Sequence, residues 1–386
     1  MRGAQVCAWI GTVLLFVGYA ARPCAAVPAF AKKYRLTCST CHSIWPMLNA
    51  YGRQFKENGY RPSRTKPLSK AEHVKALGMT LFRGTPLAVR MSGTVLEWDQ
   101  TGAMLIRPLR EVAIFIAGNV MERVSAFFEL AAEDATDWDP EAEMGKIGFH
   151  PLPALNVVIG YGPPLNVDPY QPLNHARFTR RVPMVVHAGF AAGEPLGGAA
   201  PFLSIYGRLW QRLFYTLGIS SGVHDLEGAD PKDWNVRIAV DVTSALMIGG
   251  FTIYGDRRTD NAIQWHYRRT GIDFQYQTYR WGLIGAYLRA TDRRRPDGVV
   301  ETHTAYYIQC YYILMAHNLR PLLAPFIRIE RYTLPGSSAW TTDATFGMWF
   351  YPGENVRIGM ETWRRMTAPA GEPRVARWQW TVDVAF

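Results

Sequence analysis

The chain has 386 residues and a formal net charge of +10 at pH 7. Beyond residue 26 it contains no apolar run near the ~20 residues of a membrane-spanning helix, which excludes a helical membrane protein. The excess of Lys and Arg would suit nucleic acid, but the export signal described next excludes that partner, because exported proteins do not meet nucleic acid.

Residues 1–26 have the pattern of a secretory signal peptide. Arg2 supplies the positive start, residues 6–19 are apolar, and Cys24-Ala25-Ala26 is an acceptable cleavage site. The apolar stretch is shorter than the ~20 residues that a membrane anchor requires. We therefore predict that the chain is exported and that cleavage removes Cys7 and Cys24.

The stretch Cys38-Ser39-Thr40-Cys41-His42 is the attachment motif of a c-type haem. Thiols at this spacing add to the two vinyl groups of one porphyrin, and the imidazole that follows lies under the iron as its proximal ligand. A structural zinc site would need about four Cys or His ligands, typically with a second pair, and no other cysteine here has a neighbour to pair with. We predict one covalently attached haem c, bound by Cys38 and Cys41, with His42 as the proximal iron ligand.

The haem module is predicted to span residues 27–85. Residues 41–60 have a mostly helical pattern, in which Leu48, Tyr51 and Phe55 share one face. About sixty residues are too few to bury a haem well, so we expect the module to sit in a second body.

The second axial ligand of the iron is open. Met79 is favoured slightly, because thioether ligation raises the potential, and His73 is the alternative. Met47 is too close to His42 in sequence to reach the other iron face easily. If the following domain contributes the ligand, the candidates are His175, Met184 and His187. Ordinary roles in packing or at the surface are the competing interpretation for each.

Several segments near the N-terminus resemble the start of one family, the outer-membrane cytochrome–porin fusions that include the iron oxidases of iron-oxidising bacteria. They are residues 27–34, 38–42, 46–55 and 58–60. The resemblance implies a monohaem module that plugs a barrel and passes electrons from extracellular Fe(II) to a soluble periplasmic c-type cytochrome. The implied activity is that of an Fe(II):cytochrome c oxidoreductase.

Residues 86–386 are predicted to form an all-β transmembrane barrel in the bacterial outer membrane, in contact with its lipid. Segments of about ten residues alternate in hydrophobicity, as barrel strands do. In the last one Trp378, Trp380 and Val382 share a face, while Gln379 and Thr381 share the other. A soluble β-sandwich with one wet face would also alternate. Aromatic residues near segment ends and alternating short and long connections favour the barrel.

About sixteen antiparallel strands are expected, with fourteen as the alternative. The least secure are those in 144–162. The predicted strands are 86–97, 107–118, 122–132, 144–150, 154–162, 201–209, 211–221, 233–242, 246–255, 265–277, 280–290, 301–315, 320–332, 340–350, 354–366 and 374–386.

Charged residues on the polar side of these strands are expected to line the lumen in ion pairs. The arginines are Arg208, Arg237, Arg328 and Arg357, and the acids Glu129, Asp241, Glu330 and Glu361. The connection 163–200 is too long for a plain turn, so we expect it to fold partly into the lumen near the haem module. Cys310 is expected on the lipid side as an inert buried thiol.

Two predicted outer loops are rich in carboxylates. The first carries Glu133, Asp134, Asp137, Asp139, Glu141 and Glu143, and the second carries Asp225, Glu227, Asp230 and Asp233. Hard oxygen ligands suit divalent metals, so these loops would concentrate Fe(II). Acidic loops are also ordinary hydrophilic loops.

A different class of function stays open. The chain would then be a solute porin in which the haem module acts as a plug or sensor. A third interpretation keeps the conduit but changes the donor to another reductant or a partner cytochrome.

Overall fold

The computed structural model describes most of the chain from residue 29 onward, and the predicted signal peptide lies outside the described residues. The described ranges are 29–34, 36–62, 73–76, 79–82, 87–99, 101–163, 165–171, 178–187, 190–193, 196–222, 232–259, 262–295, 297–316, 320–334, 337–369 and 375–386.

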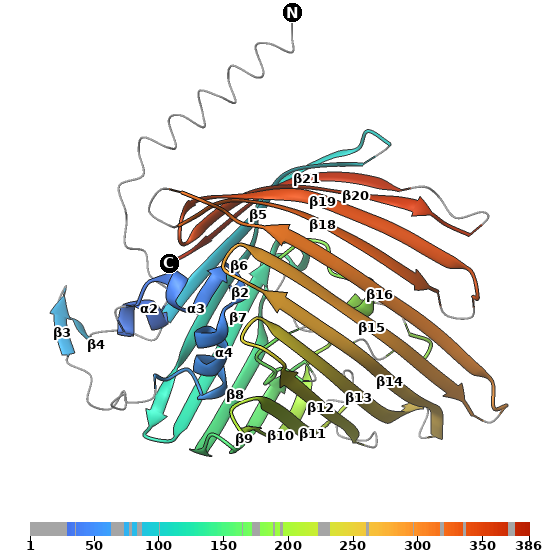
Figure 1. Ribbon diagram of the computed structural model, residues 1–386, viewed down its shortest axis with the longest axis horizontal. Helices are drawn as coiled ribbons and strands as arrows, with labels where there is room; N and C mark the ends of the chain where they lie inside the picture. The colour runs from blue at the N-terminus through green and yellow to red at the C-terminus, as the bar shows by residue number, and fades with distance from the viewer. Residues whose placement is uncertain are drawn as a thin grey trace, which may run out of the picture.

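The described part of the chain from residue 87 onward forms a closed antiparallel β-barrel of sixteen strands (Figure 1). A further strand of two residues, β17, lies between β16 and β18. Each strand pairs with the next in sequence, and β21 closes the ring on β5. The strands are β5 (Leu87–Asp99), β6 (Met104–Met121), β7 (Val124–Glu133), β8 (Pro140–Leu152), β9 (Leu155–Gly162), β10 (Ala200–Leu209), β11 (Leu213–Ser220), β12 (Asp233–Asp241), β13 (Leu246–Thr259), β14 (Ala262–Gln277), β15 (Trp281–Arg294), β16 (Val300–Tyr312), β17 (Leu314–Met315), β18 (Pro321–Thr333), β19 (Trp340–Gly353), β20 (Val356–Thr367) and β21 (Ala376–Ala385).

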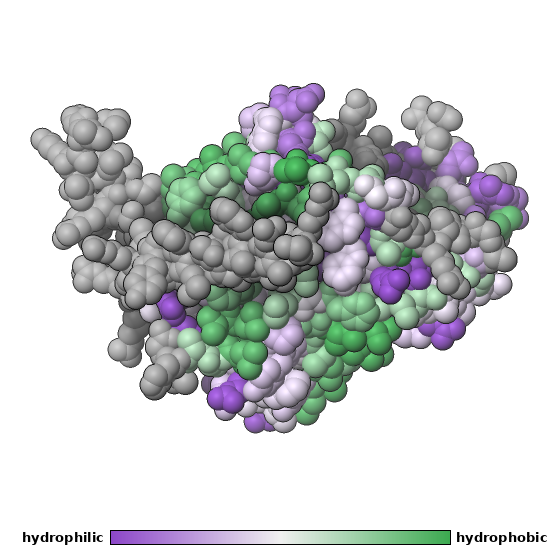
Figure 2. Space-filling model, turned by 90° about the horizontal axis from the view of Figure 1, so that it is seen from above, coloured by the Kyte–Doolittle hydropathy of each residue, from purple (hydrophilic) through white to green (hydrophobic). Residues whose placement is uncertain are grey.

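The predicted barrel is confirmed, including the two least secure strands, which are β8 and β9. The expected alternation is also present. In β21, Trp378 and Trp380 are exposed on the outside, while Gln379 and Thr381 are buried on the lumen side. Apolar side chains gather in wide areas of the molecular surface (Figure 2). A closed barrel satisfies every strand edge internally, which a lipid environment demands.

Cys310 lies on the outward side of β16 with Ile308, as predicted. Its thiol is partly exposed rather than buried, because the barrel surface around it has no covering layer within the described chain.

No helix in the described ranges is long and apolar enough to cross a membrane.

The barrel has two unlike ends. One, called here the short-turn end, carries the connections 122–123, 153–154, 210–212, 242–245, 278–280 and 354–355. The C-terminal Phe386 pairs there with Val89. The opposite end, called the long-loop end, carries longer connections, among them 134–139, 163–199 and 221–232.

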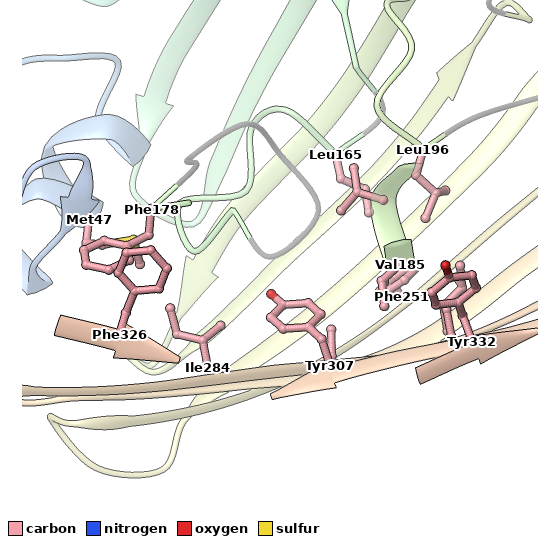
Figure 3. Packing of buried hydrophobic residues seen from close by; sticks show 14 of the residues in the cluster. Met47, Leu165, Phe178, Val185, Leu196, Phe251, Ile284, Tyr307, Phe326 and Tyr332 are labelled. Atoms are coloured by element: carbon pink, nitrogen blue, oxygen red, sulfur yellow. The ribbon is translucent and has the colours of Figure 1, made fainter. Parts of the chain in front are cut away.

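The described residues of the long connection 163–199 fold into the lumen, as predicted. Leu165, Phe178 and Leu196 are buried in one cluster with lumen-facing residues of β13 to β19, and so is Val185 of α5 (Met184–His187) (Figure 3). Backbone amides of residues 180 and 181 donate to Glu361 at 2.8 and 3.0 Å. Apolar packing and ion pairs therefore hold this segment against the barrel wall.

The predicted lumen arginines are paired, and all but the half-buried Arg208 are buried, but their partners only partly match expectation. Arg208 contacts Asp241, and Arg328 lies 3.5 Å from Glu330, as expected. Arg357 instead pairs with Asp383 at 2.7 Å. Arg237 pairs with Asp168 and Asp273. Asp383 lies on the strand next to Arg357, whereas Asp168 belongs to the lumen segment and Asp273 to β14, two strands away from Arg237.

In the described residues before β5, the chain forms three short helices and two small hairpins. These elements are α2 (Ala29–Tyr34), α3 (Cys38–Cys41), β1 (His42–Ile44), β2 (Met47–Leu48), α4 (Ala50–Glu57), β3 (His73–Ala76) and β4 (Met79–Phe82). The expectation of a mostly helical run from 41 to 60 is wrong for residues 42–48. Pro46 disfavours helical backbone at Trp45 before it, and Asn49 begins a new helix.

Candidate haem-binding site

The single turn of α3 carries both motif cysteines. Thiols three positions apart on a helix lie on the same side, and the backbone N–H of His42 donates to the Cys38 carbonyl to close the turn. Both thiols are partly exposed and free of any disulfide. Two thiols on one face match the two attachment points of one porphyrin edge.

The His42 ring is oriented by a backbone carbonyl. Its Nδ1 lies 3.2 Å from the Pro46 oxygen, which fixes the N–H tautomer at Nδ1 and leaves Nε2 free to bind a metal. Metal-ligating histidines usually have such a partner on the other nitrogen. Burial lowers the pKa of His42 to about 4, so the ring is neutral at pH 7. The residues present therefore fit a haem c.

The Cys38 thiol is in a setting that keeps it protonated. Its backbone N–H donates to Glu354 Oε2 at 2.9 Å, and burial together with this carboxylate raises the pKa of the thiol to about 11. A thiolate nucleophile needs a lowered pKa. This environment therefore disfavours a catalytic cysteine at residue 38.

Asn49 and Gly52 join α4 to the motif. The Asn49 side chain caps α4 by accepting from Gly52 N at 2.9 Å, and its amide donates to the Thr40 carbonyl at 3.0 Å. A Cβ on Gly52 would lie 2.0 Å from the Cys41 carbonyl oxygen. Only glycine lets α4 approach the motif this closely.

Replacing Gly52 with alanine should destabilise the packing of α3 on α4 by about 1–3 kcal/mol, because the added methyl group would overlap the Cys41 carbonyl. Hydrogen exchange of the amides in 38–57, followed by mass spectrometry, should become faster. Gly145→Ala is the matched control, since its Cβ would meet Phe128 at an ordinary 3.5 Å. Equal exchange in both variants would contradict this role of Gly52.

Residues of α4 contact the lumen wall through charged groups. Arg208 Nε donates to Glu57 Oε2 at 2.8 Å, and the Tyr206 hydroxyl donates to the Glu57 carbonyl at 3.0 Å. Lys56 Nζ donates to the Asp168 carbonyl at 2.7 Å. These contacts tie α4 to β10 and to the long lumen connection.

The motif itself lies against the short-turn end. Glu354, which contacts Cys38, belongs to the short turn between β19 and β20. On the β19 side, the Tyr351 hydroxyl donates to the Trp45 carbonyl at 2.9 Å. Farther along the chain, Arg61 Nη2 donates to the His150 carbonyl at 3.1 Å, near the turn between β8 and β9.

Among the candidate second ligands, only the side chains of Met47 and Met184 fall within the described residues. Met47 is buried beside Phe178 and Phe326, at the opposite end of the apolar cluster from Val185, which neighbours Met184 in α5 (Figure 3). His73 and Met79 lie on the β3–β4 hairpin, apart from α3 in Figure 1, and their side chains lie outside the described residues. The same holds for the His187 side chain and for His175. The identity of the second ligand stays a prediction.

The first acidic loop is partly neutralised. Asp134 accepts from Arg107 Nε at 2.6 Å, and Glu141 and Glu143 are exposed at the start of β8. No group of three or more His, Cys, Asp or Glu side chains within the described ranges is placed to hold a metal ion. In the second loop only Asp233 falls within those ranges.

Sequence reasoning missed the supporting residues Asn49, Gly52 and Glu57. An Asn before a helical run is an N-cap signal and would have located the start of α4. Gly52 and Glu57 act through contacts with other chain segments, and no local sequence pattern predicts such contacts.

No family model matches the sequence, and no curated protein matches it. The structure is similar to solved porins. The anion-selective porin from Comamonas acidovorans aligns with a TM-score of 0.59 at 12% identity, over 78% of this chain and 98% of that one. The trimer form of OmpT, an outer membrane protein of Vibrio cholerae, gives 0.57 at 8% identity over the same shares.

The outer membrane channel DcaP of Acinetobacter baumannii aligns with a TM-score of 0.54 at 9% identity, over 78% of this chain and 95% of that one. At identities this low, the structural alignments show a shared fold and nothing beyond it. With its outward apolar surface, the chain has the fold of an integral, porin-type outer-membrane barrel.

Proposed function

We propose that this protein is an outer-membrane electron conduit, in which one covalently bound haem c is held in a plug formed by the N-terminal module, residues 27–85. The proposed donor is extracellular Fe(II), and the proposed acceptor is a soluble periplasmic c-type cytochrome. The observation that carries the proposal is the arrangement of Cys38, Cys41 and His42 on a segment docked against the barrel. A bound haem would supply one-electron redox chemistry at its iron.

The chain's own residues would hold and orient the group. Cys38 and Cys41 offer thiols from one helical turn, and the Pro46 carbonyl keeps His42 Nε2 available for the iron. Asn49 and Gly52 fix this turn on α4. Glu57 fixes α4 on Arg208 of the barrel.

The orientation suits a periplasmic acceptor. Bacterial barrels have short periplasmic turns and longer outer loops, so the short-turn end would face the periplasm. The motif lies at that end, and Thr37 and Ser39 beside it are exposed. An acceptor protein could therefore approach the motif cysteines from the periplasm.

The packing in the lumen also supports a plugged barrel. A sixteen-stranded porin normally encloses an aqueous channel with a polar wall. Here the lumen-facing residues Leu288, Ala305 and Ala324 are fully buried, and Trp349 is 1% exposed. Free passage of solutes along this side of the lumen is incompatible with such packing.

Denatured full-length protein should keep its haem. Acid-acetone should extract none of it, since thioether bonds survive that treatment, and the pyridine haemochrome spectrum should be of the c type. The double variant Cys38→Ala/Cys41→Ala should lose the haem, while Cys310→Ala, the matched control outside the motif, should keep it. Complete extraction from the wild type would overturn the proposal.

The second candidate function is a solute porin closed by its N-terminal module. The fold comparisons by themselves favour it, since the similar structures include an anion-selective porin and an outer membrane channel. A porin predicts solute flux that does not depend on His42. A conduit predicts low solute flux and a redox activity that requires His42.

A further inference from the structure

The outward face of β14 and β15 changes character along the barrel. Nearer the short-turn end it is apolar and exposed, with Ile272 at 63% exposure and Trp281 at 51%. Towards the long-loop end the same face carries Arg268, Arg289 and Arg293, all exposed. The arginines thus begin where the apolar band ends.

Strand register brings the three arginines into one patch. Arg268 on β14 lies directly opposite Thr291 on β15. Arg289 and Arg293 are two positions to either side of Thr291 and share its face, so both are diagonal neighbours of Arg268, roughly 7–8 Å away. Their guanidinium groups can therefore converge on one ligand.

A groove of about 670 Å³ adjoins this patch. Its lining includes Arg268, Arg293, Trp234 and Tyr254, and the last two side chains are outward-facing aromatics. The acidic group on this face, Asp256, pairs with His266. The patch is therefore basic and aromatic, and the one acidic side chain among its described residues, Asp256, already has His266 as a partner.

A lipid-facing arginine is costly at the bilayer midplane but costs little near the interface, so arginines that begin where an apolar band ends mark the headgroup level. Phosphate is the anion that the planar guanidinium fork matches best. At this height on an outer-membrane barrel, phosphate groups belong to the headgroups of the outer leaflet, and apolar chains lie directly below. The patch has this same arrangement, with arginines above exposed apolar residues.

We propose that Arg268, Arg289 and Arg293 bind the phosphates of a phosphorylated glycolipid, lipid A, in the outer leaflet. This inference rests on the outer-membrane orientation proposed above and is independent of the haem. The aromatic rings of Trp234 and Tyr254 would flank the sugar and the first part of the acyl chains.

Native mass spectrometry of the detergent-solubilised full-length protein would test the site, with bisphosphorylated lipid A as the probe. Arg268→Gln/Arg289→Gln/Arg293→Gln should bind it at least about tenfold more weakly, because charge-assisted contacts to phosphate are lost. The matched control is Arg123→Gln/Arg212→Gln/Arg280→Gln, which removes three exposed arginines from the short-turn end. It should bind as the wild type does.

Three results would overturn the proposal. The first is binding of dephosphorylated lipid A as tight as that of the intact lipid. The second is binding of inorganic phosphate without binding of the lipid. The third is a lipid-free oligomer of the wild type that the triple substitution dissociates. The last result would make the face a contact between copies. Heat-modifiable migration on gels checks that each variant is folded, and single Gln variants replace the triple variant if it is not.

Discussion

Replacing Arg237 with alanine should lower the free energy of unfolding of the barrel by about 3–5 kcal/mol, the usual cost of leaving buried charges without their partner. The Arg237 side chain is fully buried. Its Nε lies 2.9 Å from Asp168 Oδ2, and its Nη2 donates to Asp273 Oδ1 at 2.9 Å. Removing the guanidinium would strand both carboxylates in a closed part of the lumen.

The effect would be measured by urea unfolding in lipid vesicles, followed by tryptophan fluorescence. Asp273→Asn in the Arg237→Ala background should restore part of the stability, because one of the stranded charges is removed. Arg212→Ala, at an exposed turn, is the matched control and should change stability by less than about 0.5 kcal/mol. Equal effects of the two alanine variants would show that the buried pairs do not stabilise the barrel.

His42→Ala should abolish reduction of the bound haem by Fe(II) while leaving the haem covalently attached through Cys38 and Cys41. The imidazole is the proposed proximal ligand, and loss of that ligand changes the potential and the spin state of the iron. Met47→Leu is the control. It keeps the volume of a buried neighbour next to Phe178 and should leave the spectrum unchanged.

Visible absorption spectra of both variants, recorded before and after addition of Fe(II), would check this prediction. A changed spectrum in Met47→Leu would make Met47 an iron ligand. An unchanged spectrum in His42→Ala would remove His42 from the site and with it the proposed haem geometry.

The strands were predictable from sequence because each barrel strand carries its own period-two pattern. Trp378, Trp380 and Gln379 reveal their faces without reference to any other strand. The pattern is weaker where both faces are apolar, as around Leu288 in β15. There the lumen face packs against the long connection 163–199 instead of water, so its inward residues are apolar too.

The proposed chemistry of the site rests on the motif from Cys38 to His42, which can be read in the sequence, whereas the contacts that hold this motif could not be predicted. The motif is local, and its spacing alone predicts a haem c. The contacts of Arg208 with Glu57, and of Glu354 with Cys38, join residues that lie far apart in sequence. Which acid faces which arginine depends on barrel register and on the path of the lumen segment, and neither can be deduced from one strand.

The most direct test of the conduit uses liposomes that contain the full-length protein and enclose a soluble c-type cytochrome. Addition of Fe(II) outside should reduce the enclosed cytochrome rapidly in wild-type liposomes. Liposomes with Cys38→Ala/Cys41→Ala protein should reduce it only at the background rate. Equal rates in the two preparations, together with leakage of small solutes through both, would contradict the conduit and identify the protein as a solute porin.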